Sequence, residues 1–170
     1  MPSDIGSQLA HTVPKVKGVV VAKAPTPLTL NNLDQLNALG GNGVWLTSKE
    51  GIQAYPKWFY GVAPDENRNT NNAVSCAIVT VDKGTGVLDA FYFYFYALNQ
   101  GNKVIGLEFG THVGDWEHNM IRFQNGTPQA VYFSQHASGE AFTYRAVEKM
   151  GIRPVVYVAK GTHAVYGTAG

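Results

Sequence analysis

The feature that most constrains the fold is a stretch of strict two-residue alternation that begins at Val87. Phenylalanine occupies successive odd positions and tyrosine successive even positions: Phe91, Phe93 and Phe95 against Tyr92, Tyr94 and Tyr96. Because the side chains of a strand alternate between its two faces, the pattern predicts a strand with a phenylalanine face and a tyrosine face. We expect the phenylalanines to face the core. The tyrosines are expected in a second layer or a cleft, where their hydroxyl groups can find partners.

The rest of the chain predicts a mainly β protein, a β-sandwich with a few short helices at its periphery. Further strands are expected at four stretches, with Asn125-Gly126 as a hairpin turn: Val13–Ala24, Gly110–Phe123, Ala130–His136 and Pro154–Ala159. Short helices are expected at Leu33–Leu39, where leucine recurs at helical spacing, and at Glu140–Met150, which Gly151 follows. We expect residues 1–170 to form a single domain that is a fragment, or one piece of a processed longer chain, because the sequence stops just after a His-bearing turn.

Composition excludes several classes of partner. The formal net charge is +1, so no basic surface is offered to nucleic acid. The longest apolar run, Ala90–Leu98, is too short for a transmembrane segment. The single cysteine, Cys76, cannot form an internal disulfide, and its apolar neighbours predict a packed thiol in a strand. The compartment is left open by these features.

The residues most suited to chemistry are concentrated between Thr111 and His118. Asp115 and Glu117 are two apart, so on a strand both point to one face. Glycine inside a strand often marks a bulge, and one at Gly114 would turn His112 toward the carboxylates. This set suits a divalent cation, with Mg²⁺, Ca²⁺ or Mn²⁺ favoured and zinc as an alternative. The competing interpretation is a solvated or ion-paired acidic strand, with Arg122 or Lys160 as the basic partner.

A second group of polar residues ends the strand expected at Ala130–His136. Ser134 and His136 share a face there, but no nucleophile elbow accompanies them, so binding is favoured over nucleophilic catalysis. His163, near Lys160, follows a glycine in the turn Gly161-Thr162-His163. Because His136 and His163 each end a strand at a polar turn containing glycine, we expect both to face the cleft of the acidic cluster.

Three runs in this order resemble the fungal and plant vacuolar protein sorting-associated sixty-two-like family. The runs are Phe109–His118, Tyr132–His136 and Arg153–Tyr157 with Gly161–Ala164, and the likeness extends back to Met1–Ile5, so it covers nearly the whole chain. Members of that family have sequence before and after these motifs, which agrees with the expectation that this chain is a fragment. The resemblance implies a secreted or vacuolar location, and the family name reports a sorting phenotype and not a mechanism.

A partial likeness to the necrosis-inducing proteins of plant pathogens covers the middle third of the chain. Their run Gly-His-Arg-His-Asp-Trp-Glu follows an aromatic strand in a β-sandwich with flanking helices. The likeness implies metal ligands at His112, Asp115 and Glu117. Asn99 or Gln100 falls near the position of their loop aspartate, with Asn99 as the possible fourth ligand, and Gly114 replaces their second histidine. Those proteins bind sphingolipid head groups, which implies a head-group ligand by analogy.

Together these features predict metal-dependent binding of a glycan or glycolipid head group. The cation would coordinate ligand hydroxyls, and the predicted binding residues are Tyr92, Tyr94, Trp116, Ser134 and Lys160. The alternative is a metal-assisted glycan hydrolase or lyase, in which His136 or His163 acts as acid or base. A third interpretation is a structural or sorting partner in the vacuole, with the acidic cluster only stabilising the sheet. Besides the glycan or glycolipid, the remainder of its own processed chain is a candidate partner. Whether the protein is an enzyme is left open.

Overall fold

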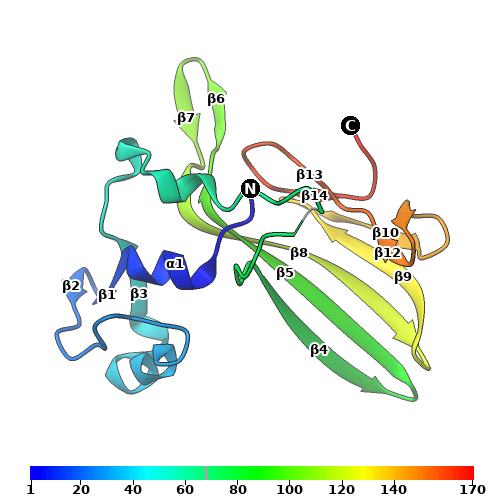
Figure 1. Cartoon of the computed structure of the whole chain (residues 1–170), viewed down its shortest axis with the longest axis horizontal. Coiled ribbons are helices and arrows are strands. Elements are labelled where there is room, and N and C mark those ends of the chain that lie inside the picture. Colours follow the sequence, from blue (N-terminus) through cyan, green and yellow to red (C-terminus); the bar gives the residue numbers. More distant parts are fainter. Residues whose placement is uncertain (68) are drawn as a thin grey trace. The chain divides into compact units, whose positions relative to one another are not determined.

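The computed structural model describes residues 1–67 and 69–170. The chain is mainly β, with several antiparallel sheets and few short helices (Figure 1), which confirms the predicted class and is consistent with a β-sandwich. The described residues group into two compact units, which are described separately. The first comprises residues 1–75, 96–98 and 112–114, and the second comprises residues 76–95, 99–111 and 115–170.

The first unit contains a small sheet in the strand order β2-β1-β3 and a core built on Leu9, Leu28 and Leu36. Its elements are α1 (Ile5–Ala10), β1 (Thr12–Val16), β2 (Val19–Val20), η1 (Leu33–Leu39), η2 (Gly41–Gly43), β3 (Val44–Ser48), η3 (Ile52–Ala54) and η4 (Lys57–Tyr60). The helix expected at Leu33–Leu39 is present as the 3₁₀-helix η1. A leucine at every third position matches the three residues per turn of that helix type. The strand expected at Val13–Ala24 is shorter, because the chain turns at Lys17-Gly18 and returns as β2.

The start of the chain is fixed by polar side chains. Asp4 caps α1 by accepting a hydrogen bond from the Ser7 amide at 2.6 Å, and its other carboxylate oxygen accepts one from the Val74 amide at 2.7 Å. The buried Ser3 hydroxyl accepts a hydrogen bond from the Ala97 amide at 2.9 Å. Sequence analysis did not predict α1, although aspartate is a favoured N-cap residue and was the available signal.

The second unit is built on a five-stranded antiparallel sheet in the order β10-β9-β8-β5-β4. Its strands are β4 (Cys76–Gly84), β5 (Val87–Asn99), β8 (His112–Gln124), β9 (Thr127–Ser134) and β10 (Gly139–Thr143). Three two-stranded pairs complete the unit: β6 (Asn102–Val104) with β7 (Leu107–Phe109), β11 (Lys149–Met150) with β12 (Arg153–Pro154), and β13 (Tyr157–Val158) with β14 (Val165–Tyr166). The predicted hairpin at Asn125-Gly126 is confirmed, and it joins β8 to β9.

The alternating strand predicted from Val87 is confirmed as β5, but of its phenylalanines, which were expected to face the core, Phe95 is buried whereas Phe91 and Phe93 are only partly buried. The main core of the second unit lies on the face that carries Tyr92, which we call the tyrosine face. That core contains the buried residues Ile121, Val131, Phe133, Val147 and Val165. Val147 and Val165 follow the sheet in the sequence and cover this face, which alternation within β5 alone does not reveal. The opposite, phenylalanine face carries Phe91, Phe93 and Phe95 with the neighbouring side chains Trp116 and His118.

The helix predicted at Glu140–Met150 is wrong. Residues 139–143 form β10, which pairs with β9, and Phe142 packs edge-on against the buried Phe133 with 6.0 Å between ring centroids. Pairing to the sheet edge and burial of Phe142 outweigh the local helical preference of this stretch. The single strand expected at Pro154–Ala159 is divided between β12 and β13.

Candidate functional site

The candidate site begins at the amino-terminal end of β8, where carboxylates occupy the tyrosine face. Glu117, Asn119 and Ile121 alternate along the strand, and all three are buried. Asp115 precedes them in the same alternation. Gly114 has a φ of 77°, so the backbone departs from extended geometry where sequence analysis expected a break. Along this side of β8 the side chains therefore change from carboxylates to an amide and then to an apolar group within a few residues.

His163 lies beside Asp115. Its Nδ1 is 3.2 Å from Asp115 Oδ2, and the side chains are 11% and 12% exposed, respectively. The turn that carries His163 is fixed by Gly161, which has a φ of 90° and whose carbonyl accepts a hydrogen bond from the Gln100 amide at 2.9 Å. A Cβ at Gly161 would lie 2.9 Å from the Gln100 carbonyl oxygen, so this close approach favours glycine. The contact with Asp115 agrees with the expectation that His163 lies by the acidic cluster.

Asn99 ends β5 and is almost completely buried. Its Nδ2 donates a hydrogen bond to the Gly110 carbonyl at 2.8 Å, and nearby the Gly101 amide donates one to Thr111 Oγ1 at 3.1 Å. Asn99 Oδ1 is buried and accepts no hydrogen bond from any residue that the structure describes. Buried polar atoms are normally satisfied, so this oxygen can accept a further hydrogen bond or coordinate a cation.

The predicted cation site was His112, Asp115, Glu117 and Asn99. Carboxylate and amide oxygens are the donors that Mg²⁺, Ca²⁺ and Mn²⁺ prefer, and the orphaned Asn99 oxygen fits that chemistry. Within residues 1–67 and 69–170, however, no three His, Cys, Asp or Glu side chains form a group that could hold a metal ion. His112 is grouped with the first unit, whereas the other three belong to the second. The ligand assignment therefore remains a prediction.

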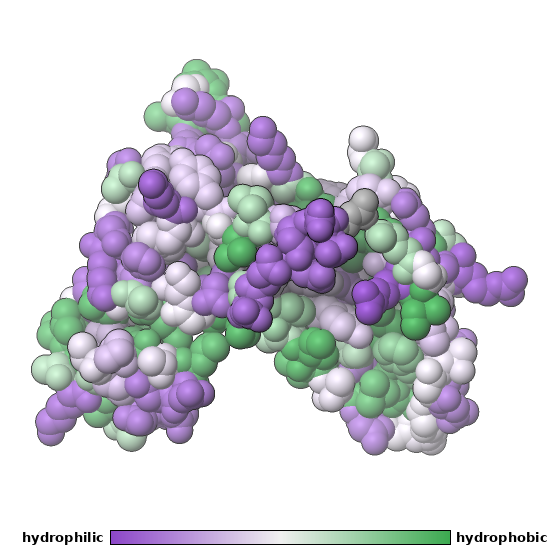
Figure 2. All heavy atoms as spheres, viewed as in Figure 1, coloured by the Kyte–Doolittle hydropathy of each residue, from purple (hydrophilic) through white to green (hydrophobic). Residues whose placement is uncertain are grey.

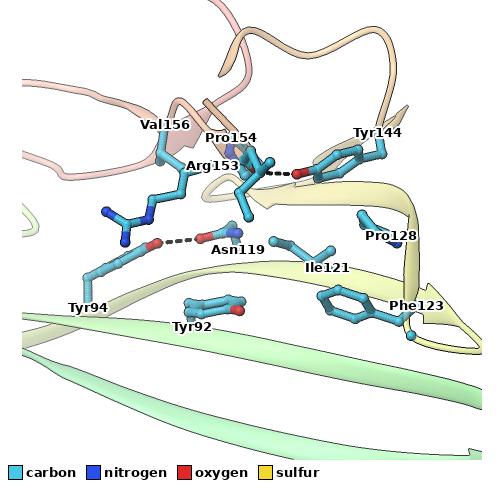
Figure 3. A pocket seen from close by; sticks show the side chains of 12 residues that line it. Tyr92, Tyr94, Asn119, Ile121, Phe123, Pro128, Tyr144, Arg153, Pro154 and Val156 are labelled. Carbon is cyan, nitrogen blue, oxygen red and sulfur yellow. Dashed lines mark hydrogen bonds between the residues drawn. The ribbon is translucent and has the colours of Figure 1, made fainter. Parts of the chain in front are cut away.

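A pocket of about 630 Å³ opens on the tyrosine face further along β8 (Figure 3). It is lined by Tyr92, Tyr94, Asn119, Ile121, Phe123, Gly126, Pro128, Tyr144, Ile152, Arg153, Pro154 and Val156. The Tyr94 hydroxyl donates to Asn119 Oδ1 at 2.6 Å, and the Tyr144 hydroxyl donates to the Ile152 carbonyl. These bonds orient two aromatic rings in a mainly apolar pocket, which we call the tyrosine pocket.

Arg153 supplies the positive charge of the tyrosine pocket. Its side chain extends over the pocket, and Figure 3 shows the guanidinium pointing toward the Tyr94 hydroxyl. No carboxylate forms an ion pair with Arg153 in the described part of the chain. The described lining residues include no histidine, aspartate or glutamate. The described lining thus offers aromatic faces, an amide and a guanidinium group.

Other predicted site residues lie outside the tyrosine pocket. Trp116 is 46% exposed and packs against Phe95 on the phenylalanine face, with 4.9 Å between ring centroids. Ser134 is partly buried at the end of β9, and Lys160 is exposed. His136 is exposed in the bend after β9, and no residue that the structure describes forms a hydrogen bond or ion pair with its side chain. Tyr92 and Tyr94 are therefore the predicted binding residues that the pocket brings together.

Arg122 departs from the expected ion-pair alternative, and His118 lies on the other face of the sheet. Arg122 pairs with Asp89 through two hydrogen bonds of 2.7 and 2.8 Å, and not with the acidic cluster. The hydrogen bonds from Arg122 lower the pKa of Asp89. On the phenylalanine face, His118 stacks on Phe93 at 5.0 Å, and burial lowers the His118 pKa, which favours the neutral imidazole. The histidine beside Asp115 is His163, which was expected in the cleft of the acidic cluster but was not among the ion-pair partners named for it.

Sequence reasoning missed Asn119, Tyr144 and Arg153 as pocket residues. Asn119 could have been found by continuing the alternation two residues beyond Glu117. Arg153 begins one of the runs that carried the family resemblance, but its place beside β5 and β8 depends on contacts between distant parts of the chain. Tyr144 lay in a predicted helix, so its position in the pocket was hidden by that error.

These features define a class: a mainly β protein with an aromatic-lined pocket and nearly buried carboxylates on the same side of one strand. The model of the family described as vacuolar protein sorting-associated protein 62 matches residues 96–170. Two proteins of Saccharomyces cerevisiae match more of the chain. The chain is 38% identical to TDA6, a proposed vacuolar protein sorting-associated protein, over 146 residues, which are 75% of this chain and 31% of the relative. It is 34% identical to vacuolar protein sorting-associated protein 62 over 147 residues, which are 78% of this chain and 32% of the relative.

The chain belongs to the vacuolar protein sorting-associated protein 62-like family, which confirms the predicted resemblance. It spans about a third of the length of the curated relatives it matches. No solved structure shows significant similarity to it. Over the described residues, no helix combines the length and apolar character needed to span a membrane.

Proposed function

We propose that the second unit binds a glycan or glycolipid head group in the tyrosine pocket, assisted by a divalent cation at the acidic end of β8. The observation that carries the proposal is the pocket itself, in which Tyr92 and Tyr94 lie beside Asn119 and Arg153. Its volume of about 630 Å³ falls within the range of small-molecule sites, roughly 300–1,000 Å³. A mono- or disaccharide is an occupant of suitable size.

The chemistry of the pocket suits a sugar. Aromatic rings present flat apolar faces against which the C–H groups of a sugar can pack, and Tyr94 is already oriented by its bond to Asn119. Asn119 and the tyrosine hydroxyl groups can exchange hydrogen bonds with ligand hydroxyls. Arg153 can bind a carboxylate or phosphate substituent with two parallel hydrogen bonds. These groups favour a glycan that carries an anionic substituent.

A cation would act at the other end of the same side of β8. Asp115 and Glu117 provide carboxylate oxygens, and the orphaned Asn99 Oδ1 provides an amide oxygen from β5. Mg²⁺, Ca²⁺ and Mn²⁺ prefer such ligands, and ligand hydroxyls could complete their coordination. When bound, the cation would supply positive charge for oxygen atoms of the head group. Meanwhile Asp115 also orients the imidazole of His163.

One observation favours a second candidate function, a metal-assisted glycan hydrolase or lyase. Asp115 and His163 form a nearly buried carboxylate–imidazole pair, an arrangement that can orient a general base or acid. His163 and Asp115 are not among the residues that line the tyrosine pocket, which is why binding is placed first. Release of reducing ends or unsaturated sugars from polysaccharides by the wild type, abolished in His163→Gln, would establish the enzyme.

The binding proposal is tested on an array of immobilised glycans in buffer with Mn²⁺ and in buffer with a chelator. The wild type is expected to bind a restricted set of acidic glycans with Mn²⁺, and Arg153→Met is expected to bind them at least about tenfold more weakly, since hydrogen bonds to charged groups are involved. Arg145→Met, at an exposed arginine outside the pocket, is the matched control and should bind as the wild type does. Equal binding by both variants would contradict the pocket assignment.

The cation is tested separately by isothermal titration of chelated protein with Mg²⁺, Ca²⁺, Mn²⁺ and Zn²⁺. The wild type is expected to give an isotherm with at least one of them. Asp115→Asn and Glu117→Gln should each weaken it by more than about a hundredfold, beyond the loss typical of residues that only support ligands. If none of the four ions gave a binding isotherm, the cation would be excluded from the proposal. The pocket assignment would then rest on the glycan array alone.

A further inference from the structure

The hairpin formed by β6 and β7 stands clear of the five-stranded sheet (Figure 1) and ends in apolar side chains. The end of this hairpin is coloured hydrophobic in Figure 2. Four of its apolar side chains are exposed: Val104 at 51%, Ile105 at 98%, Leu107 at 64% and Phe109 at 58%. In a folded protein such a group of exposed apolar residues marks a contact surface.

Ile105 is unfavourable at its position because of both its backbone conformation and its exposure to solvent. Its φ is 50° and that of Gly106 is 79°, so Ile105 is a β-branched residue in the left-handed region of a tight turn. The other turns of this kind in the chain carry polar residues before glycine, as in Thr85-Gly86 and Asn125-Gly126. Neither local conformation nor burial explains an isoleucine that is almost fully exposed there. A residue that destabilises the turn and is not buried is expected to serve a contact outside the fold.

The hairpin is also two-sided. Val104 pairs with Leu107 and Asn102 with Phe109, so these side chains share one face, whereas Lys103 and Glu108 share the other. Its backbone is paired within the hairpin, and its base is held by the bond from Asn99 to Gly110 and the bond from Gly101 to Thr111. The hairpin is therefore a preformed amphipathic element whose apolar end carries few unsatisfied backbone groups.

We propose that the β6–β7 hairpin inserts its apolar end into the interfacial region of a lipid bilayer. Strands of three residues rise about 10 Å, which is comparable with the roughly 5–10 Å depth at which interfacial elements bury their apolar face. Paired backbone is required there, because the acyl region offers no hydrogen-bond partners. Four apolar side chains are few for a standard protein–protein interface, which uses about 20–30 residues on each side. The inference does not depend on the glycan pocket.

The test uses vesicles of phosphatidylcholine alone, without glycolipid and with a chelator, so that neither a glycan nor a divalent cation is present. The wild type is expected to sediment with the vesicles, and Ile105→Asn to bind about tenfold or more weakly, as the loss of one buried aliphatic side chain implies. Asparagine suits the turn conformation, so this variant should fold at least as well as the wild type. Val19→Asn, at another exposed aliphatic residue, is the matched control and should bind normally.

Depth is measured with an environment-sensitive fluorophore on Ile105→Cys in a Cys76→Ser background. Its emission is expected to shift to the blue when vesicles are added, whereas the same label on Val19→Cys should not respond. Failure of the wild type to bind, or binding by Ile105→Asn equal to that of the wild type, would overturn the proposal. A blue shift that appears when unlabelled copies of this protein are added, and not when vesicles are added, would point to a protein contact instead. That result would equally overturn the proposal.

Discussion

The two faces of the five-stranded sheet in the second unit differ in how their aromatic residues are used. On the tyrosine face, Tyr94 is bonded to the buried amide of Asn119, and its ring lines an open pocket. On the phenylalanine face, Phe93 stacks against His118, whose pKa is lowered by burial. The tyrosine face thus presents polar and aromatic groups to an open pocket, which is the basis of the binding proposal, whereas the aromatic groups of the other face pack against each other.

The largest difference between the faces should be in stability. Phe133 is fully buried in the core beneath the tyrosine face, so Phe133→Ala is expected to lower the free energy of unfolding by about 3–5 kcal/mol. Phe93 is only partly buried, so Phe93→Ala should lower it by roughly half as much. Urea unfolding followed by circular dichroism measures both. Equal losses would show that the phenylalanine face is as much a part of the core as the tyrosine face.

The faces should also differ in their response to a cation. A ligand that binds the native state alone raises the free energy of unfolding by about 2.7 kcal/mol at a hundred times its Kd. The wild type is expected to show such a gain with Mn²⁺, and Glu117→Gln should show little or no gain. His118→Gln should show the full gain, because residue 118 lies on the phenylalanine face. Thermal melts with and without Mn²⁺ provide the measurement. A gain that survives in Glu117→Gln would place the cation elsewhere.

A smaller effect is expected from the hydrogen bond at the pocket wall. Tyr94→Phe removes the hydroxyl that donates to Asn119 and leaves a buried acceptor unpaired, so it should lower the free energy of unfolding by about 1–2 kcal/mol. Tyr132→Phe is the control, because the Tyr132 ring lies beside His118 on the opposite face. Unfolding in urea compares the two variants. A larger loss in Tyr132→Phe would contradict the importance given to the Tyr94–Asn119 bond.

The smallest effect is a pH dependence from the pair of Asp89 and Arg122. Because the pair lowers the Asp89 pKa below its unfolded value, its stabilisation is present above about pH 4 and is lost as the pH falls through the lower, folded pKa. Water screens the interaction, since the Arg122 side chain is half exposed. The difference in unfolding free energy between the wild type and Asp89→Asn should therefore be modest at pH 7 and shrink at pH 3. A difference that does not change with pH would rule out this origin.

Local sequence patterns predicted much of the sheet. The errors arise where contacts with distant segments of the chain determine the structure. The alternation at β5 and the Asn125-Gly126 turn are short-range signals, and both predicted elements are present. The orientation of β5 depends on Val147 and Val165, which cover the tyrosine face from later in the chain. The stretch predicted as a helix at Glu140–Met150 begins instead as the sheet-edge strand β10, for the same reason.

The candidate site was likewise predicted in part. The contact of His163 with Asp115 agrees with the expectation from its glycine-containing turn, and Tyr92 and Tyr94 line a pocket as the tyrosine face suggested. Arg153 and Tyr144 reach that pocket only through the pairing of β12 and the path of the chain after β10. Spacing along one strand can place residues on a face, but it carries no information about which later segment covers that face.

The central claim is that the tyrosine face binds the ligand, and chemical-shift mapping tests it most directly. Isotope-labelled protein in Mg²⁺ is titrated with a glycan selected on the array, and the shifts of both faces are compared. We expect the largest changes at the tyrosine pocket, at Asn119 and Arg153 above all, with little change at Phe93 and Trp116. Changes concentrated at Phe93 and Trp116, or no saturable change at the pocket, would contradict the claim.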